Sequence, residues 1–206
     1  MSHLNPVAHA TPVDRVGRLI LASRSPRRAE LLTAAGIIFE IFALEIDEQP
    51  RVGEAPGAYV ERLAVEKAQA VFAWYPSETV LGADTTVVVD GRMLGKPADR
   101  ADAVDMLRAL RGRVHEVLTG VAVVGPAGVT SAVERTRVWF HDVTDEDISA
   151  YVDSGEPMDK AGAYAIQGLA SRFVPRIEGS YTNVVGLPVA LVSSILKGER
   201  PFPAKS

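Results

Sequence analysis

The chain has 206 residues, a formal net charge of −4, no cysteine and a hydrophobic fraction of 47%. This composition is typical of a globular protein with a substantial core, and it excludes disulfides and cysteine-based zinc sites. The negative charge argues against a surface built for non-specific nucleic-acid binding. No apolar run approaches the roughly 18 residues that cross a bilayer. We therefore expect no nucleic-acid partner and no membrane association.

The two ends of the chain differ in composition from its middle. Residues 1–17 contain two prolines and two histidines but no apolar core of about 7–15 residues, so they do not resemble a signal peptide. We predict a flexible extension over 1–17, one domain over 18–198 that is either two-lobed or a large single unit, and a short tail over 199–206. The expected location is the cytoplasm.

Hydrophobic periodicity and turn residues predict that strands and helices alternate along the chain. A hairpin turn is expected at 125–128, and a capping box at Thr144–Asp147 opens a later helix. Because the sheet includes antiparallel pairs, the expected class is α/β with a mixed sheet. In chain order we predict a strand over 18–22, a helix over 26–35, a strand over 39–44, a helix over 58–74, a strand over 80–89 with a turn at 90–91, a helix over 99–111, strands over 114–124 and 129–140, a helix over 144–155, a glycine-rich segment over 162–179 and a helix over 187–196.

The first predicted helix begins with an unusual concentration of positive charge. Pro26 suits the first helical position, and Ser23 and Ser25 are both candidate caps. Arg27 and Arg28 follow directly, although the helix dipole disfavours cations at this end. An anionic ligand, such as a phosphate chain, would account for this placement.

Lys67 is the second unusual cation, because it projects from the apolar face of the predicted helix 58–74. Val60 and Leu63 lie on that face at helical spacing from Lys67. Two interpretations stay open. In one, the stem packs and the ammonium extends to water; in the other, the ammonium reaches into a cleft.

Carboxylates complete a pattern suited to polyphosphate chemistry. Asp84 lies in the apolar strand 80–89, where it is either a structural carboxylate at a bulge or a paired or metal-binding group. Glu45, Asp47 and Glu48 form an acidic segment, which by itself is typical of a solvated loop. Together with Asp84 they offer the oxygen ligands that Mg²⁺ or Mn²⁺ prefers. Lys96, between a glycine and a proline, is either a surface lysine or a cation with a fixed direction. Together the cations would bind a polyphosphate, and the carboxylates would hold the metal that neutralises it.

Several common nucleotide and hydrolase motifs do not occur. The chain has no G-x-x-x-x-G-K-[ST], no G-x-G-x-x-G and no G-x-S-x-G. This argues against P-loop, dinucleotide-binding and α/β-hydrolase enzymes.

The ordered motifs resemble those of the Maf family of nucleoside triphosphate pyrophosphatases. The resemblance extends from about Leu19 to Lys197, and Arg24 departs from it where small residues are common. The matching segments are Leu21–Ser23, Ser25–Arg28, Asp47–Glu48, Arg62–Ala64, Glu66–Ala68, Gly82–Thr85, Gly95–Pro97, Thr119–Val123, Asp159–Gly168 and Asn183–Pro188.

This resemblance implies a fold like that of inosine triphosphate pyrophosphatases, with an elongated mixed sheet flanked by helices and a cleft between two lobes. It also implies hydrolysis between the α- and β-phosphates of dTTP and UTP, which gives a nucleoside monophosphate and pyrophosphate. A divalent cation, Mg²⁺ or Mn²⁺, would be the cofactor, and the nucleoside triphosphate would be the main partner. A homodimer stays open.

The resemblance also implies a role for each site residue. Asp84 would accept the proton of the attacking water and lie next to the metal, and Glu48 would be a metal ligand. The residues that would hold the triphosphate are Ser23, Arg27, Lys67 and Lys96. Those that would select the nucleotide are Arg28, Thr85 and Gln167. An amide suits a pyrimidine edge because it both donates and accepts, but without the resemblance Gln167 is equally a loop amide that caps backbone groups.

Two other functions stay open at this point. The substrate could be a modified or purine triphosphate, such as 7-methyl-GTP. In a different class, the family is also associated with inhibition of septum formation, which would make the chain a regulator of cell division that acts through a partner. The sequence contains no amphipathic tail or charge block suited to such a partner.

Overall fold

A single mixed sheet organises the molecule. The computed structural model describes residues 18–199. Its sheet has seven strands in the order β2-β1-β3-β5-β6-β7, and β4 pairs with β3. β1 is parallel to both of its neighbours and every other pairing is antiparallel. The strands are β1 (Leu19–Leu21), β2 (Glu40–Ile41), β3 (Thr79–Val89), β4 (Arg92–Leu94), β5 (Val114–Gly125), β6 (Gly128–Trp139) and β7 (Arg176–Glu178).

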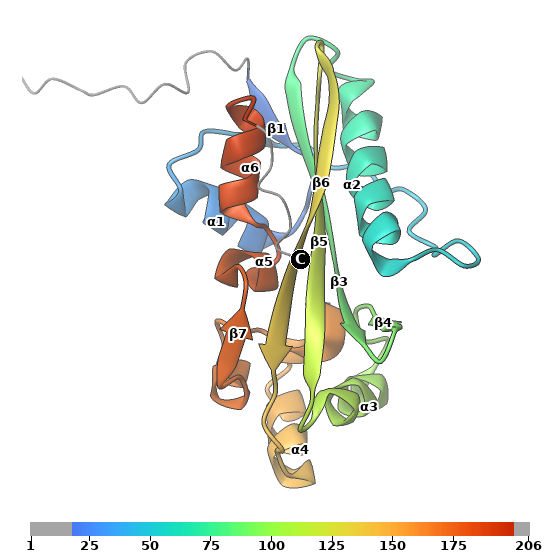
Figure 1. Cartoon of the computed structure of the whole chain (residues 1–206), viewed down its shortest axis with the longest axis vertical. Helices are drawn as coiled ribbons and strands as arrows, with labels where there is room; N and C mark the ends of the chain where they lie inside the picture. The colour runs from blue at the N-terminus through green and yellow to red at the C-terminus, as the bar shows by residue number, and fades with distance from the viewer. Residues whose placement is uncertain (1–17, 200–206) are drawn as a thin grey trace, which may run out of the picture.

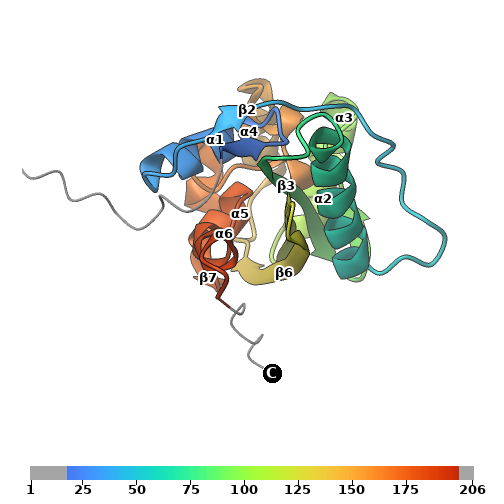
Figure 2. The same ribbon diagram turned by 90° about the horizontal axis from the view of Figure 1, so that it is seen from above.

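Helices cover the sheet from both sides. α2 packs on one face, and α1, α5 and α6 lie on the other (Figures 1 and 2). α3 and α4 lie together near the end of the long β3, β5 and β6 strands (Figure 1). The α-helices are α1 (Pro26–Ala34), α2 (Pro56–Phe72), α3 (Arg100–Leu110), α4 (Asp145–Asp153), α5 (Tyr181–Val185) and α6 (Val189–Leu196). The 3₁₀ helices are η1 (Glu156–Asp159), η2 (Ala161–Ala163) and η3 (Leu169–Phe173).

Two strand glycines let α2 approach the sheet closely. A Cβ atom at Gly120 would collide with the backbone carbonyl of Val60, and one at Gly82 would collide with that of Ala64. Glycine inside a strand often marks such a close approach of another backbone. The apolar face of α2 therefore rests directly on β3 and β5, and this contact brings Lys67 over the middle of β3.

The apolar core is divided along the length of the sheet. One large cluster joins α3 and α4 to the aromatic side chains of Phe140, Tyr151 and Phe173. Separate clusters lie under α1 and α6 on one face and under α2 on the other. Each strand alternates its side chains between the two faces, so β3 and β5 contribute residues to all three clusters.

Most predicted elements are present, with differences where periodicity is weak. The predicted strand 39–44 shortens to two residues, and the helix predicted over 58–74 begins and ends two residues earlier. The glycine-rich segment contains 3₁₀ helices and β7, and α5 was not expected. These segments are too short for a repeating apolar pattern to identify them. The segments 1–17 and 200–206, which include the predicted flexible extension and most of the tail, lie outside the described residues.

The helix caps were predicted with mixed success. The capping box between Thr144 and Asp147 is confirmed. Ser25 is the N-cap of α1, but its side chain makes no capping hydrogen bond. Ser23 Oγ instead accepts from the backbone N–H of Ser25 at 3.2 Å. Over residues 18–199, no helix is long and apolar enough to cross a membrane.

Candidate functional site

A cleft of about 940 Å³ brings the predicted site residues together. They come from both faces of the sheet and from segments far apart in the chain. The cleft is lined by all nine of them: Ser23, Arg27, Arg28, Glu48, Lys67, Asp84, Thr85, Lys96 and Gln167.

Asp84 and Lys67 form an ion pair in the lining of the cleft. Lys67 Nζ lies 2.7 Å from Asp84 Oδ1 and 2.8 Å from Glu48 Oε1. The ammonium therefore bridges two carboxylates, and the interpretation in which it extends to open water is wrong. Asp84 is only 7% exposed. Burial raises the pKa of the Asp84 carboxyl, while the charges of Lys67 and Arg28 act to lower it.

The same two carboxylates fit a divalent cation that arrives with a phosphate chain. Glu48 and Asp84 converge on one cation, the Lys67 ammonium, so their oxygens already face a common point. Mg²⁺ is commonly held by one or two carboxylates together with substrate phosphates and water. Within residues 18–199 there is no cluster of three acidic, histidine or cysteine side chains that could bind a metal by itself. The donor set thus suits a metal that shares its coordination with a bound ligand better than a metal held by the protein alone.

Arg28, which also lines the cleft, connects three elements by hydrogen bonds. Its Nε donates to Gly186 O at 2.9 Å, and its Nη1 donates to Ser23 Oγ at 3.0 Å and to Ala83 O at 2.9 Å. Its Nη2 donates to Thr85 Oγ1 at 3.2 Å. Burial lowers the pKa of Arg28, and the nearby carboxylate of Asp84 opposes this effect. Most of its donors are thus used to join α1, β3 and the end of α5.

Arg27 faces a carboxylate that the sequence analysis did not single out. Its Nη1 lies 2.6 Å from Asp159 Oδ2. Burial acts to raise the pKa of Asp159, but hydrogen bonds from Lys160 and Arg27 lower it to about 2. Asp159 and Lys160 both line the cleft. The available signal was their place at the start of a matching motif, next to a glycine-rich segment, which by itself does not indicate which cation they meet.

Lys96 and Gln167 are both exposed residues in the lining of the cleft. Neither side chain has a hydrogen bond or ion pair with any residue between 18 and 199, although both line the cleft. The interpretation of Gln167 as an amide that caps loop backbone is therefore wrong. Both groups retain their hydrogen-bonding capacity for a ligand.

Comparison with known proteins identifies the family. The family description "Maf-like protein" matches residues 18–199. The chain belongs to the Maf family. A Koribacter versatilis relative named dTTP/UTP pyrophosphatase is 52% identical over 179 residues, which cover 87% of this chain and 93% of the relative. A Geobacter metallireducens relative of the same name is 54% identical over 182 residues and covers 87% of this chain and 95% of its own.

A solved structure supports the fold of this Maf chain. The Staphylococcus aureus Ham1 protein superposes with a TM-score of 0.51 at 16% identity, and covers 89% of this chain and 100% of its own. At this identity the likeness concerns the fold alone. It confirms the predicted class, a mixed sheet flanked by helices.

Proposed function

We propose that this Maf chain hydrolyses dTTP and UTP to the nucleoside monophosphate and pyrophosphate. The observation that carries the proposal is a buried carboxylate, Asp84, in a cleft that also holds the cations Arg27, Lys67 and Lys96. Relatives of about 50% identity that are named dTTP/UTP pyrophosphatase support the same reaction. The substrate is a soluble nucleotide, which agrees with the expected cytoplasmic location.

In this mechanism, Asp84 accepts a proton from the attacking water. The water oxygen bonds to the α-phosphorus, the bond from that phosphorus to the bridging oxygen breaks, and pyrophosphate leaves. The raised pKa of Asp84 makes its carboxylate a stronger base than an exposed aspartate. Before substrate binds, Lys67 fixes the orientation of this carboxylate. Arg27 and Lys96 stabilise negative charge on the phosphates.

Glu48 and Asp84 would hold Mg²⁺ or Mn²⁺, which neutralises charge on the triphosphate. The Lys67 ammonium lies between these two carboxylates. It is therefore placed to turn from the carboxylates to a phosphate oxygen when the substrate binds. This assigns Lys67 to phosphate binding, as the sequence resemblance implies.

Nucleotide selection is assigned to Gln167, Arg28 and Thr85. Gln167 presents an amide with no protein partner among residues 18–199, so it can donate to and accept from a pyrimidine. Thr85 Oγ1 is held by Arg28 and lies 3.0 Å from Thr119 Oγ1. Arg28 therefore contributes by fixing Thr85 and the backbone at Gly186.

The decisive experiment is pyrophosphate release from a panel of nucleotides with Mg²⁺ or Mn²⁺. The panel contains dTTP, UTP, CTP, ATP, GTP and 7-methyl-GTP. We expect the highest kcat/KM for dTTP and UTP, with pyrophosphate and the monophosphate as products. Preference for 7-methyl-GTP would contradict the pyrimidine assignment, and release of orthophosphate would contradict cleavage between the α- and β-phosphates. Asp84→Asn serves as the inactive control.

A further inference from the structure

The segment that carries Glu48 has little apolar packing to hold it in place. Residues 45–55 lie between β2 and α2 and form neither helix nor strand, apart from a turn at 52–53. None of these residues is buried. Ordering a backbone costs about 1–2 kcal/mol per residue, and here no apolar core offsets that cost. Polar contacts must therefore determine where Glu48 lies.

Two side chains of α2 hold consecutive carbonyls of this segment. Tyr59 Oη donates to the backbone carbonyl of Glu48 at 3.0 Å. Arg62 Nη2 donates to the backbone carbonyl of Gln49 at 3.2 Å. Tyr59 and Arg62 lie three residues apart and so share one face of the helix. The backbone on both sides of the Glu48–Gln49 peptide is thus fixed from α2.

Arg62 also pairs with Glu54 at the other end of residues 45–55, and we call this pair the clamp. Its Nε lies 2.6 Å from Glu54 Oε1, and its Nη2 lies 2.8 Å from Glu54 Oε2. This two-pronged geometry is the strong form of an arginine–carboxylate pair. Only 13% of the Arg62 side chain and 9% of the Glu54 side chain are exposed. The hydrogen bond from Arg62 lowers the pKa of Glu54 to about 2.

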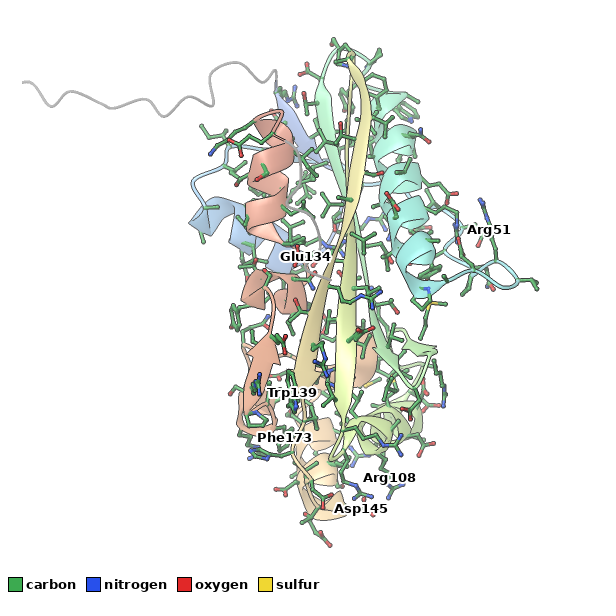
Figure 3. The ribbon with its side chains drawn as sticks, in the orientation of Figure 1. Arg51, Arg108, Glu134, Trp139, Asp145 and Phe173 are labelled. Carbon is green, nitrogen blue, oxygen red and sulfur yellow. The ribbon has the colours of Figure 1, made fainter. Side chains whose placement is uncertain are left out.

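The clamp extends to a second carboxylate on α2. Arg62 Nη1 lies 3.0 Å from Glu66 Oε2, and Arg51 of the segment lies 3.0 Å from Glu66 Oε1. Figure 3 shows Arg51 on the segment that projects beyond α2. One residue further along the helix, Lys67 holds the Glu48 carboxylate itself. Helix α2 therefore fixes both the backbone and the side chain of Glu48.

We propose that Arg62, through its pair with Glu54, is a positioning residue that holds Glu48 against Asp84. The inference rests on the proposed function, because Glu48 matters only if its carboxylate serves the reaction. Arg62 touches no reacting group. Its effect on catalysis is exerted through Glu48.

Steady-state kinetics of Arg62→Gln and Arg62→Lys test the proposal. We expect kcat for dTTP to fall about 10–100-fold in Arg62→Gln, the size of effect that a misplacement of about 1 Å causes. KM should change less than kcat, because Arg62 itself contacts neither Arg27, Lys67 nor Lys96. Arg62→Lys should recover only part of the loss, since an ammonium cannot make the two-pronged contact. Arg135→Gln is the matched control, because Arg135 forms an exposed pair with Glu116 at 3.1 Å.

A double-mutant cycle separates positioning from a general structural effect. In a Glu48→Gln background, Arg62→Gln should lower kcat by less than about twofold, because the group that it positions is already absent. Equal loss in both backgrounds would overturn the proposal. If Arg62→Gln does not fold, Glu54→Gln removes the other half of the clamp and takes its place in the same cycle.

Trypsin provides a readout that does not depend on activity. Native wild-type protein should resist cleavage after Arg51, whereas Arg62→Gln should be cleaved there at least about fivefold faster, because local opening controls proteolysis. An unchanged cleavage rate would show that Arg62 does not hold residues 45–55 in place. If the wild type releases pyrophosphate from no nucleotide, the proposed function fails, and the cleavage rate still decides whether Arg62 holds the segment.

Discussion

The Lys67 ammonium lies 2.7 Å from Asp84, although the two residues come from different layers of the fold. Lys67 projects from α2 and Asp84 lies on β3. The pair forms because glycines at positions 82 and 120 let the helix backbone rest on the sheet. A buried carboxylate of this kind is costly without a partner. The contact with Lys67 thus offsets part of the cost of burying Asp84 and orients its carboxylate before any substrate arrives.

Replacement of Asp84 by asparagine should abolish most activity and leave the fold intact. The amide has nearly the same shape and can accept a hydrogen bond from Lys67, but it cannot take a proton from water. We expect kcat for dTTP to fall by about two to four decades, the typical size of a general-base loss. Pyrophosphate release measures the activity, and urea unfolding measures stability. Turnover close to that of the wild type would show that another group is the base.

Lys96 should affect substrate binding without affecting stability. Its side chain lines the cleft and has no hydrogen bond or ion pair within residues 18–199. In Lys96→Met we expect kcat/KM for dTTP to fall about 10–100-fold, the equivalent of one charge-assisted hydrogen bond. The free energy of unfolding should change by less than about 0.5 kcal/mol. Lys197→Met, on an exposed residue after α6, is the control, and equal kinetics for the two variants would remove Lys96 from the site.

The sequence was sufficient to predict the main elements and nine of the residues that line the cleft. Asp84 was identifiable because a carboxylate interrupts an apolar strand, and Lys67 because a cation interrupts an apolar helix face. The contact between Arg27 and Asp159 was not predictable, because it joins residues 132 positions apart and Asp159 lies in a short 3₁₀ helix. Periodicity identifies faces of long elements, but it does not determine which loop meets which helix.

The structure also separates two arginines that look alike in the sequence. Arg28 donates four hydrogen bonds inside the protein, whereas Arg24 is exposed and pairs with an exposed glutamate. Arg28→Ala should therefore lower the free energy of unfolding by about 2–4 kcal/mol, since it leaves part-buried acceptors without donors.

The matched control is Arg24→Ala, close to Arg28 in the sequence. It should lower the free energy of unfolding by less than about 0.5 kcal/mol, because exposed ion pairs contribute little. Urea denaturation of both variants makes the comparison. Equal losses in the two variants would contradict the structural role of Arg28.

Gln167 should influence which nucleotide is hydrolysed. Its exposed amide has no partner within residues 18–199, so Gln167→Ala leaves no protein group unsatisfied and should not change stability. We expect the ratio of kcat/KM for dTTP to that for GTP to fall about tenfold or more, because hydrogen bonds to a base are lost from one substrate only. Leu169→Ala, on an exposed side chain in the same region, is the control. An unchanged ratio in Gln167→Ala would place selectivity elsewhere.

His115 should make the protein less stable in mild acid. It is 1% exposed, and its Nε2 lies 2.8 Å from Tyr164 Oη, while its Nδ1 has no hydrogen-bond partner among residues 18–199. Burial lowers the pKa of His115 to about 4. The unfolded chain, in which the pKa is about 6.5, then binds the proton more readily than the folded one. The contribution of neutral His115 to the free energy of unfolding is therefore complete above about pH 6.5, and it is lost progressively as the pH falls toward 4.

The size of this effect follows from the shift itself. A decrease of about 2.5 units corresponds to roughly 3 kcal/mol, at 1.36 kcal/mol per unit. His115→Gln keeps a polar group near Tyr164 but does not titrate, so its free energy of unfolding should vary less between pH 7 and 4.5 than that of the wild type. The depressed carboxyl pKa values of Glu54 and Asp159, both about 2, act mainly below this window. Urea unfolding at pH 7, 6, 5 and 4.5 measures the free energy of unfolding of both proteins. If that free energy changes with pH equally in the wild type and in His115→Gln, His115 is not the cause of the acid sensitivity.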